Sequence, residues 1–240
     1  MKKFYILLTL IAVLAICFYQ YGRATWHPLV VKVMGKKTVS EVIDEYGPDA
    51  RNKLKPIFNQ KGVFYPPPKL SFVAFKDTDT LEVWAANDNE SYTLITSYPV
   101  KAASGELGPK LEEGDRQVPE GIYKIVGFNP NSAYHLSMKL NYPNEFDTYH
   151  ANHEGRTEPG TNIFIHGKAS SIGCLAMGDE AIEELFTLVH DAGRSKTTVL
   201  ISPTNPSLNS LEIPVDAPEW TAELYRQIES KYRAINPLKG

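Results

Sequence analysis

Cysteine is nearly absent from this sequence, since only Cys17 and Cys174 occur among its 240 residues. So few cysteines exclude a disulfide-stabilised scaffold, which depends on several bridges. An excess of charge of one sign is also lacking, because 25 Lys and Arg residues stand against 28 Asp and Glu residues, leaving a formal net charge of −3. That balance provides no electrostatic footprint for nucleic acid. We therefore expect no nucleic-acid partner.

Long hydrophobic runs are lacking too, with one exception at the N-terminus. Lys2 and Lys3 precede an uncharged stretch over residues 4–22. Basic residues before an apolar run are typical of an export signal. We expect residues 1–24 to be a signal peptide, since small residues near its end favour cleavage. The run is also nearly long enough for a membrane anchor, which is the alternative.

Export makes the remaining cysteine unusual, because Cys174 then has no intramolecular partner in an oxidising compartment. His166 precedes it closely and ends an apolar, β-branched run. Cysteine is a good nucleophile only as the thiolate, and a nearby imidazole is the usual means of producing one near neutral pH. We predict that two short strands joined by a turn bring these side chains together, and that the pKa of the thiol is lowered.

A structural role for this pair is the alternative, because most free cysteines behave as small buried hydrophobic residues. Export favours catalysis, since an unpaired thiol outside the cytosol is a liability unless chemistry requires it. Gly173 directly precedes the cysteine and leaves room for a substrate carbonyl. The backbone N–H groups of Gly173 and Cys174 are therefore candidates for an oxyanion hole.

Periodicity divides the chain into four parts, which we predict to be the export segment 1–24, a helical N-terminal segment with a proline-rich linker over 25–68, a main catalytic domain over 69–203, and a C-terminal extension with a helix over 204–240. The N-terminal helical pattern over 39–58 is interrupted at Gly47-Pro48.

Alternating or β-branched runs predict strands in the main domain at residues 70–75, 81–86, 92–97, 121–127, 134–140, 162–166 and 197–201, with hairpin chemistry at 87–89. Apolar spacing predicts one helix over 179–192 and another opened by a capping box at 216–219. The predicted fold class is mainly β with peripheral helices (α+β).

The His-Gly pair at residues 166–167, followed by Ser-x-Gly-Cys at 171–174, resembles the L,D-transpeptidase catalytic domain family (YkuD-like). Stretches at residues 108–123, 129–136 and 171–177 are similar to its YafK-like branch, exported enzymes of the Gram-negative cell wall. Several motifs in one order are more specific than a single Gly-Cys pair. The resemblance implies the YkuD-like L,D-transpeptidase β-fold over residues 70–203.

This resemblance implies a periplasmic, peptidoglycan-modifying enzyme with Cys–His catalysis and no cofactor. Cys174 would be the nucleophile and His166 its base, with the carbonyl of Gly167 orienting the imidazole. A thioester would form at the diaminopimelate carbonyl of a stem peptide and pass to water or an amine. Peptidoglycan stem peptides are thus the expected partners, and a peptidoglycan-linked outer-membrane lipoprotein is a further candidate.

Two positions depart from the commoner family pattern, which has a second histidine just before Gly-Cys and a polar residue two positions after the cysteine. Ile172 and Ala176 stand there. With these polar groups lost, we expect transfer to water to exceed transfer to an amine. One alternative is a lipoprotein-releasing amidase without crosslinking activity. Another is a non-catalytic wall-binding module, which would have no use for a reactive thiol.

Substrate contacts are expected from the same motifs. Lys110, Asp115 and Arg116 would bind the carboxylates and amine of diaminopimelate, or else form a solvated loop. Tyr134 and His135 would line the cleft, or else be a packed tyrosine with an exposed histidine. Ser171 of the cysteine motif completes the predicted set.

A zinc site is the remaining alternative, because His150 and His153 could join His166. The spacing of the first two would suit a helix, but this stretch lacks helical periodicity, and no acidic ligand lies at a familiar offset. We therefore predict no metal site.

Overall fold

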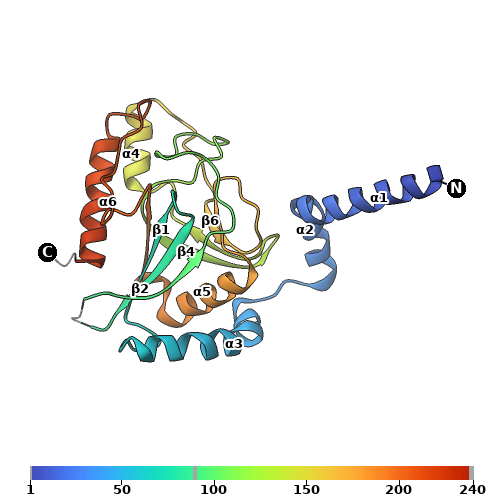
Figure 1. Cartoon of the computed structure of the whole chain (residues 1–240), viewed down its shortest axis with the longest axis horizontal. Helices are drawn as coiled ribbons and strands as arrows, with labels where there is room; N and C mark the ends of the chain where they lie inside the picture. Colours follow the sequence, from blue (N-terminus) through green and yellow to red (C-terminus); the bar gives the residue numbers. More distant parts are fainter. Residues whose placement is uncertain (1, 89–90, 238–240) are drawn as a thin grey trace.

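A computed structural model describes residues 2–88 and 91–237 (Figure 1). Within those residues, eight strands form one sheet in the order β3-β2-β1-β8-β4-β5-β6-β7. Neighbouring strands are antiparallel except β1 with β8 and β6 with β7. The strands are β1 (Lys69–Phe75), β2 (Thr80–Ala86), β3 (Thr93–Pro99), β4 (Gly121–Ser132), β5 (His135–Leu140), β6 (Phe164–His166), β7 (Leu175–Ala176) and β8 (Thr197–Ser202).

Helices cover the sheet, with α3 and α5 packed together on one side and α6 on the other (Figure 1). The helices are α1 (Lys2–Tyr21), α2 (Arg23–Met34), α3 (Val39–Gln60), α4 (Glu145–His153), α5 (Asp179–Ala192) and α6 (Thr221–Ile235), with a short 3-10 helix at Arg194–Lys196. Sheet and helices together confirm the predicted α+β class.

Strand β1 shows how the sequence builds a core on each face of the sheet. Successive side chains of a strand point to opposite faces. Leu70 and Phe72 join the core under α3 and α5, whereas Val73 and Phe75 join the core under α6. A strand buried on both faces reads as a continuous apolar run, which is what residues 70–75 show.

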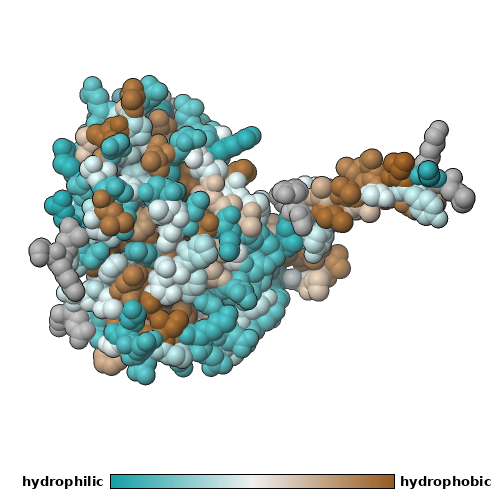
Figure 2. Space-filling view, in the orientation of Figure 1, coloured by the Kyte–Doolittle hydropathy of each residue, from teal (hydrophilic) through white to brown (hydrophobic). Residues whose placement is uncertain are grey.

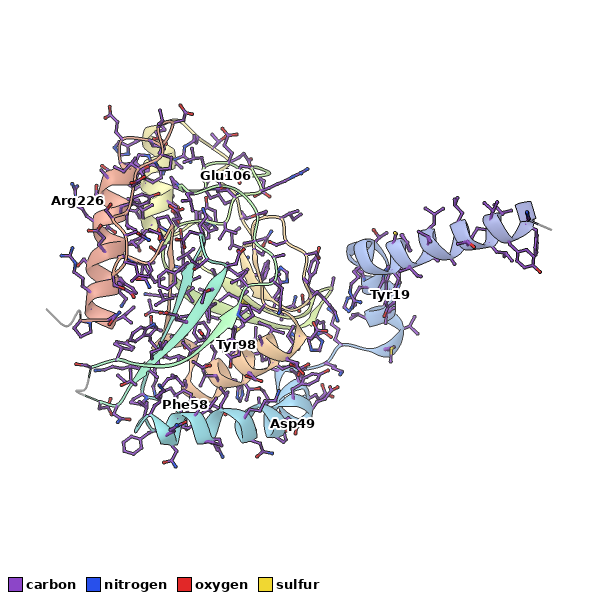
Figure 3. The ribbon with its side chains drawn as sticks, in the orientation of Figure 1. Tyr19, Asp49, Phe58, Tyr98, Glu106 and Arg226 are labelled. Atoms are coloured by element: carbon purple, nitrogen blue, oxygen red, sulfur yellow. The ribbon has the colours of Figure 1, made fainter. Side chains whose placement is uncertain are left out.

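Side chains from neighbouring elements tie the layers together. Tyr98 at the end of β3 donates a hydrogen bond from its hydroxyl to Glu184 of α5 at 2.6 Å (Figure 3). Phe58 of α3 is fully buried beside the same layer (Figure 3). The predicted N-terminal helical segment therefore shares the core of the main domain, while its boundary at residue 68 stays a prediction.

Helix α3 runs unbroken through Gly47-Pro48, so the predicted interruption is wrong. A proline inside a helix costs about 3 kcal/mol. Two features offset that cost here: a capping box between Thr38 and Glu41 closes the first turn, and a full apolar face is buried against α5 and the sheet. Burial of several large side chains contributes more than the backbone hydrogen bonds that the helix loses at Pro48 and Pro56.

Two helix starts also differ from the sequence-based expectation. Helix α4 begins at a capping box in which Asn144 accepts from the N–H of Asp147 at 3.1 Å, so the expectation of no helix at residues 150–153 is wrong. Helix α6 begins at Thr221 with no side-chain cap, so the capping box predicted at residues 216–219 is wrong. Those residues form a turn, in which Ala217 donates to Pro214.

The N-terminal helices α1 and α2 extend away from the remainder of the chain, and many of their exposed side chains are hydrophobic (Figure 2). Arg23 touches the main body, donating from Nε to the carbonyl of Ala133 at 2.7 Å. In the part of the chain that the structure describes, no helix combines the length and the apolar character needed to cross a membrane.

A buried ion pair holds the long loop between β3 and β4. Lys76 Nζ lies 3.0 Å from Glu120 Oε1 and donates to the carbonyls of Gly108 and Val118 at 3.0 and 3.1 Å. The hydroxyl of Tyr225 in α6 donates to Glu120 Oε2 at 2.8 Å. Glu120 therefore does more than turn the chain into β4, because it ties the loop to Lys76, which follows β1, and to Tyr225 of α6.

We expect Glu120→Ala to lower the free energy of unfolding by about 3–5 kcal/mol, because it leaves the buried Lys76 ammonium without its counter-charge. Urea denaturation of the purified protein measures this change. Glu229→Ala is the matched control, since Glu229 and Arg233 form an exposed ion pair at 3.7 Å. Equal, small losses in both variants would contradict a stabilising role for the network.

Candidate active site

Strands β6 and β7 carry the predicted catalytic pair. They run parallel, with Ile165 opposite Leu175 and His166 opposite Ala176. His166 ends β6, and Cys174 lies immediately before β7. Parallel neighbours usually need a long crossover, but here the loop between the strands is short. Both side chains line one pocket of about 530 Å³, so the predicted proximity of the two residues holds.

The imidazole of His166 is buried and fixed at one nitrogen. Its Nδ1 lies 2.6 Å from the carbonyl of Gly167, so Nδ1 carries the proton, because a carbonyl can only accept. The ring of Tyr134 covers the imidazole at 4.8 Å between centroids. Burial lowers the pKa of His166 and the bond to Gly167 opposes this only in part. The neutral imidazole therefore keeps a free lone pair at Nε2.

Gly167 is a glycine because no side chain fits at its position. A Cβ there would lie 2.7 Å from the carbonyl oxygen of Tyr134 and 2.8 Å from Asp179 Oδ1. Such distances are too short for real contacts, so a larger residue would displace the carbonyl that holds His166. The close approach explains the His-Gly pair in physical terms.

The thiol of Cys174 is partly buried, and its Sγ lies 3.8 Å from the carbonyl of Asn162. Burial raises the pKa of Cys174, and a backbone hydrogen bond and the charge of Lys110 oppose this only partly. The expectation of a lowered thiol pKa is therefore wrong for this arrangement. Cys174 stays protonated near neutral pH and requires a base to become a nucleophile.

Serine hydroxyls occupy both N–H groups that the sequence proposes for an oxyanion hole. The Gly173 N–H donates to Ser104 Oγ at 2.7 Å, and the Cys174 N–H donates to Ser171 Oγ at 2.8 Å. Ser171 Oγ in turn donates to the Cys174 carbonyl at 2.6 Å. Ser104 was not predicted, because nothing in its local sequence indicates a contact with a residue 69 positions away.

Four of the six predicted substrate-binding residues line the pocket with the catalytic pair, namely Lys110, Arg116, Tyr134 and Ser171. Asp115 and His135 do not line it. Asn129, Ser137 and Asn162 also line the pocket and were not predicted. The site therefore draws on the long loop, the β4–β5 hairpin and the segment leading into β6.

The basic and acidic residues of the loop have different roles. Lys110 is buried and donates from Nζ to the carbonyl of Glu112 at 2.6 Å and to Asp115. Asp115 also accepts from three backbone N–H groups of its loop, including that of Gln117 at 2.9 Å. Its carboxylate therefore organises the loop. Arg116 is exposed and makes no side-chain hydrogen bond to the described residues.

His135 points away from the pocket although its neighbour Tyr134 lines it. Its Nε2 lies 2.7 Å from Glu183 Oε1 of α5, and its ring meets Tyr46 edge-on at 5.2 Å. The backbone of His135 has φ of 74°, an unusual value for a residue with a side chain. Because of this turn in the backbone, the side chain of Tyr134 lies in the pocket while that of His135 lies against α5.

The histidines of α4 take part in aromatic packing. His150 stacks on Trp220 with centroids 4.7 Å apart, and His153 Nδ1 lies 3.0 Å from the carbonyl of Tyr149. Across residues 2–88 and 91–237, no group of three or more His, Cys, Asp or Glu side chains is arranged to hold a metal ion.

Known proteins with similar sequences indicate the family to which this site belongs. The profile of the family described as YkuD, L,D-transpeptidase catalytic domain, matches residues 72–201, which is more than half of the chain. The candidate L,D-transpeptidase YafK of Escherichia coli strain K12 is 36% identical over 134 residues, 54% of this chain and 52% of that protein. The chain thus spans about half the length of the curated relatives it matches.

Solved structures with partial similarity include the helical cell shape determining protein Pgp2 of Campylobacter jejuni, at 23% identity and a TM-score of 0.48, covering 57% of this chain and 48% of that one. Bd1075 of Bdellovibrio bacteriovorus is 19% identical with a TM-score of 0.42, covering 70% of this chain and 56% of that one.

Proposed function

Because the chain belongs to the L,D-transpeptidase catalytic domain family, we propose that it is a periplasmic cysteine enzyme that modifies peptidoglycan stem peptides. The observation that carries this proposal is the shared pocket of Cys174 and His166, in which Gly167 fixes the imidazole and leaves Nε2 free. Export by residues 1–24 would deliver the enzyme to that compartment.

In the proposed reaction, His166 Nε2 takes the proton of the Cys174 thiol as Sγ attacks the diaminopimelate carbonyl of a stem peptide. The raised thiol pKa makes this concerted transfer necessary, since little thiolate exists beforehand. The tetrahedral intermediate then expels the amine, which takes the proton from the imidazolium. The product is a thioester on Cys174, which water or a second amine cleaves.

The developing oxyanion needs N–H donors, and the nearest backbone candidates belong to Gly173 and Cys174. Both now donate to serine hydroxyls. A charged oxyanion is a stronger acceptor than a neutral hydroxyl. We therefore propose that it takes over at least one of these N–H groups when the substrate enters.

Arg116 is the pocket residue best suited to bind a substrate carboxylate. Its guanidinium is exposed and presents paired N–H donors that match a carboxylate. Lys110 and Asp115 are less suited, because each already neutralises the other within the loop. Of the predicted diaminopimelate-binding set, Arg116 is thus the one that we propose contacts this group.

We expect water to be the main acceptor of the acyl group. Transpeptidation needs a second amine held in position for attack. Ile172 lines the pocket with 74% of its surface exposed and offers no hydrogen bond to such an amine. Ala176 is fully buried in β7, so having alanine in place of the polar residue of the commoner family pattern does not alter the pocket surface.

Mass spectrometry of muropeptides tests this expectation. Given tetrapeptide muropeptides and lipoprotein-linked sacculi together, the purified protein should release free stems or free lipoprotein faster than it forms crosslinks. Release of lipoprotein alone would identify an amidase. Accumulation of diaminopimelate–diaminopimelate dimers as the main product would instead establish a transpeptidase, and no covalent change in any substrate would contradict the enzyme proposal.

A further inference from the structure

Ser137 of β5 lies directly opposite His166 of β6 in an antiparallel pair. Along these strands the Gly167 N–H donates to the Leu136 carbonyl at 3.1 Å and the Leu140 N–H donates to the Ile163 carbonyl at 2.9 Å, so the hydrogen-bonded pairs fall at every second position, which includes 136/167 and 140/163. Ser137 and His166 therefore form a non-hydrogen-bonded pair. Side chains approach each other most closely in such pairs, in which the Cα atoms are about 4.5 Å apart.

The side chain of Ser137 lies in the pocket lining and takes no part in the hydrogen bonds that hold the described part of the fold together. Ser137 is only 3% exposed, yet it lines the pocket with His166 and Cys174. Its Oγ makes no hydrogen bond to any residue that the structure describes. The fold does not use this hydroxyl, so it is available to a partner that forms in the pocket during the reaction.

When His166 takes the proton of Cys174, its Nε2 gains an N–H group, and Nε2 has no hydrogen-bond partner among the described residues. The resulting imidazolium has two N–H groups, of which Gly167 binds only the one at Nδ1. Other charged or titratable groups lining the pocket are Lys110, Glu113, Arg116 and Tyr134. Tyr134 packs its ring against the imidazole, and none of the four hydrogen-bonds His166.

We propose that Ser137 is a third catalytic residue, whose Oγ accepts a hydrogen bond from the Nε2–H of His166 after that nitrogen has taken the Cys174 proton. The inference rests on the proposed function, since it assumes that His166 is the base. In the transfer the S–H bond breaks and the Nε2–H bond forms. When the leaving amine takes the proton, Ser137 is free again.

Acylation of Cys174 in the full-length protein by p-nitrophenyl acetate tests this proposal. Sγ displaces p-nitrophenolate and forms an acetyl thioester, which peptide mapping by mass spectrometry assigns to Cys174 or Cys17. We expect Ser137→Ala to lower the plateau rate at Cys174 roughly tenfold or more, the effect of a hydrogen bond to a charged group. Ser137→Thr, which keeps the hydroxyl, should retain most of the rate.

The pH profile distinguishes this role from a structural one. His166 must be neutral to act, so the rate falls as the pH drops through its pKa. Loss of an acceptor that stabilises the imidazolium lowers that pKa, and the acid limb of Ser137→Ala should move to lower pH by about one unit. Ser71→Ala is the matched control, since Ser71 is a buried serine with an unpartnered hydroxyl in β1, outside the pocket lining.

A wild-type plateau and acid limb in Ser137→Ala would overturn the inference and leave the proposed function intact. An acid limb shifted to higher pH would also overturn it, because the hydroxyl would then donate to neutral His166. Equal effects of Ser71→Ala would reduce Ser137 to a structural residue. If Cys174 of the wild-type protein reacted no faster than Cys17, the proposed function and the inference would fail together.

Discussion

Cys174→Ala is expected to form no covalent intermediate and to lose roughly 10⁴-fold or more of the activity on stem peptides, the scale of removing a nucleophile. No other cysteine lines the pocket, since Cys17 lies in α1 and is exposed. The fold should survive, because Cys174 is only partly buried and alanine deletes a single atom. Intact-mass analysis after incubation with stem peptides or a carbapenem-type acylating agent measures the adduct.

Cys17→Ala is the control for this experiment and should keep both the adduct and the activity. An adduct that persists in Cys174→Ala and disappears in Cys17→Ala would refute the assignment of the nucleophile. The raised pKa of Cys174 adds a second expectation. Simple alkylation by iodoacetamide should be slow at pH 7 and should accelerate as the pH rises past the ordinary range of a thiol, because no thiolate is formed in advance.

His166→Gln should lower the rate of acylation by roughly 10²–10⁴-fold, the usual contribution of a positioned base. Glutamine fills a similar volume but cannot take the thiol proton. In the wild-type protein, burial lowers the pKa of His166. Because the neutral imidazole is the active form, the wild-type rate should persist below the ordinary pKa of histidine and fall only as the pH drops through the lowered value.

His135→Gln is the matched histidine control, since His135 pairs with Glu183 and does not line the pocket. Rates of thioester formation over a pH series compare the two variants. We expect His135→Gln to retain most of the activity. Near-native activity in His166→Gln together with its loss in His135→Gln would show that the base has been assigned to the wrong residue.

Features with a local cause were predictable from the sequence. The helix over residues 179–192 follows from its apolar spacing, and the structure confirms its bounds as Asp179–Ala192. His166 and Cys174 were identified because their chemistry and their small neighbours lie within one short stretch. Tyr134, too, was placed near the cleft, because it belongs to a recognisable motif.

Features set by distant contacts were not predictable. Ser104 meets Gly173, and Ser137 faces His166, only because loops and strands far apart in the chain come together. No local pattern distinguishes such serines from others. Helix α3 shows the same principle in its backbone, since Gly47-Pro48 favours a break and only tertiary burial keeps the helix whole.

The parallel pairing of β6 and β7 restricts how this site can change in length. A strand reverses the facing of its side chains at every residue, so adding or deleting one residue within β6 would turn His166 away from the pocket. A similar change beside β7 would alter the register of Leu175 against Ile165. Ser171 is fixed as well, because its hydroxyl bonds the N–H and the carbonyl of Cys174, and this leaves the more accessible residues 169 and 170 between the fixed ends. Related sequences can therefore accept insertions between the histidine and the cysteine of this site only in that short interval. The number of residues that separates the two can vary only there.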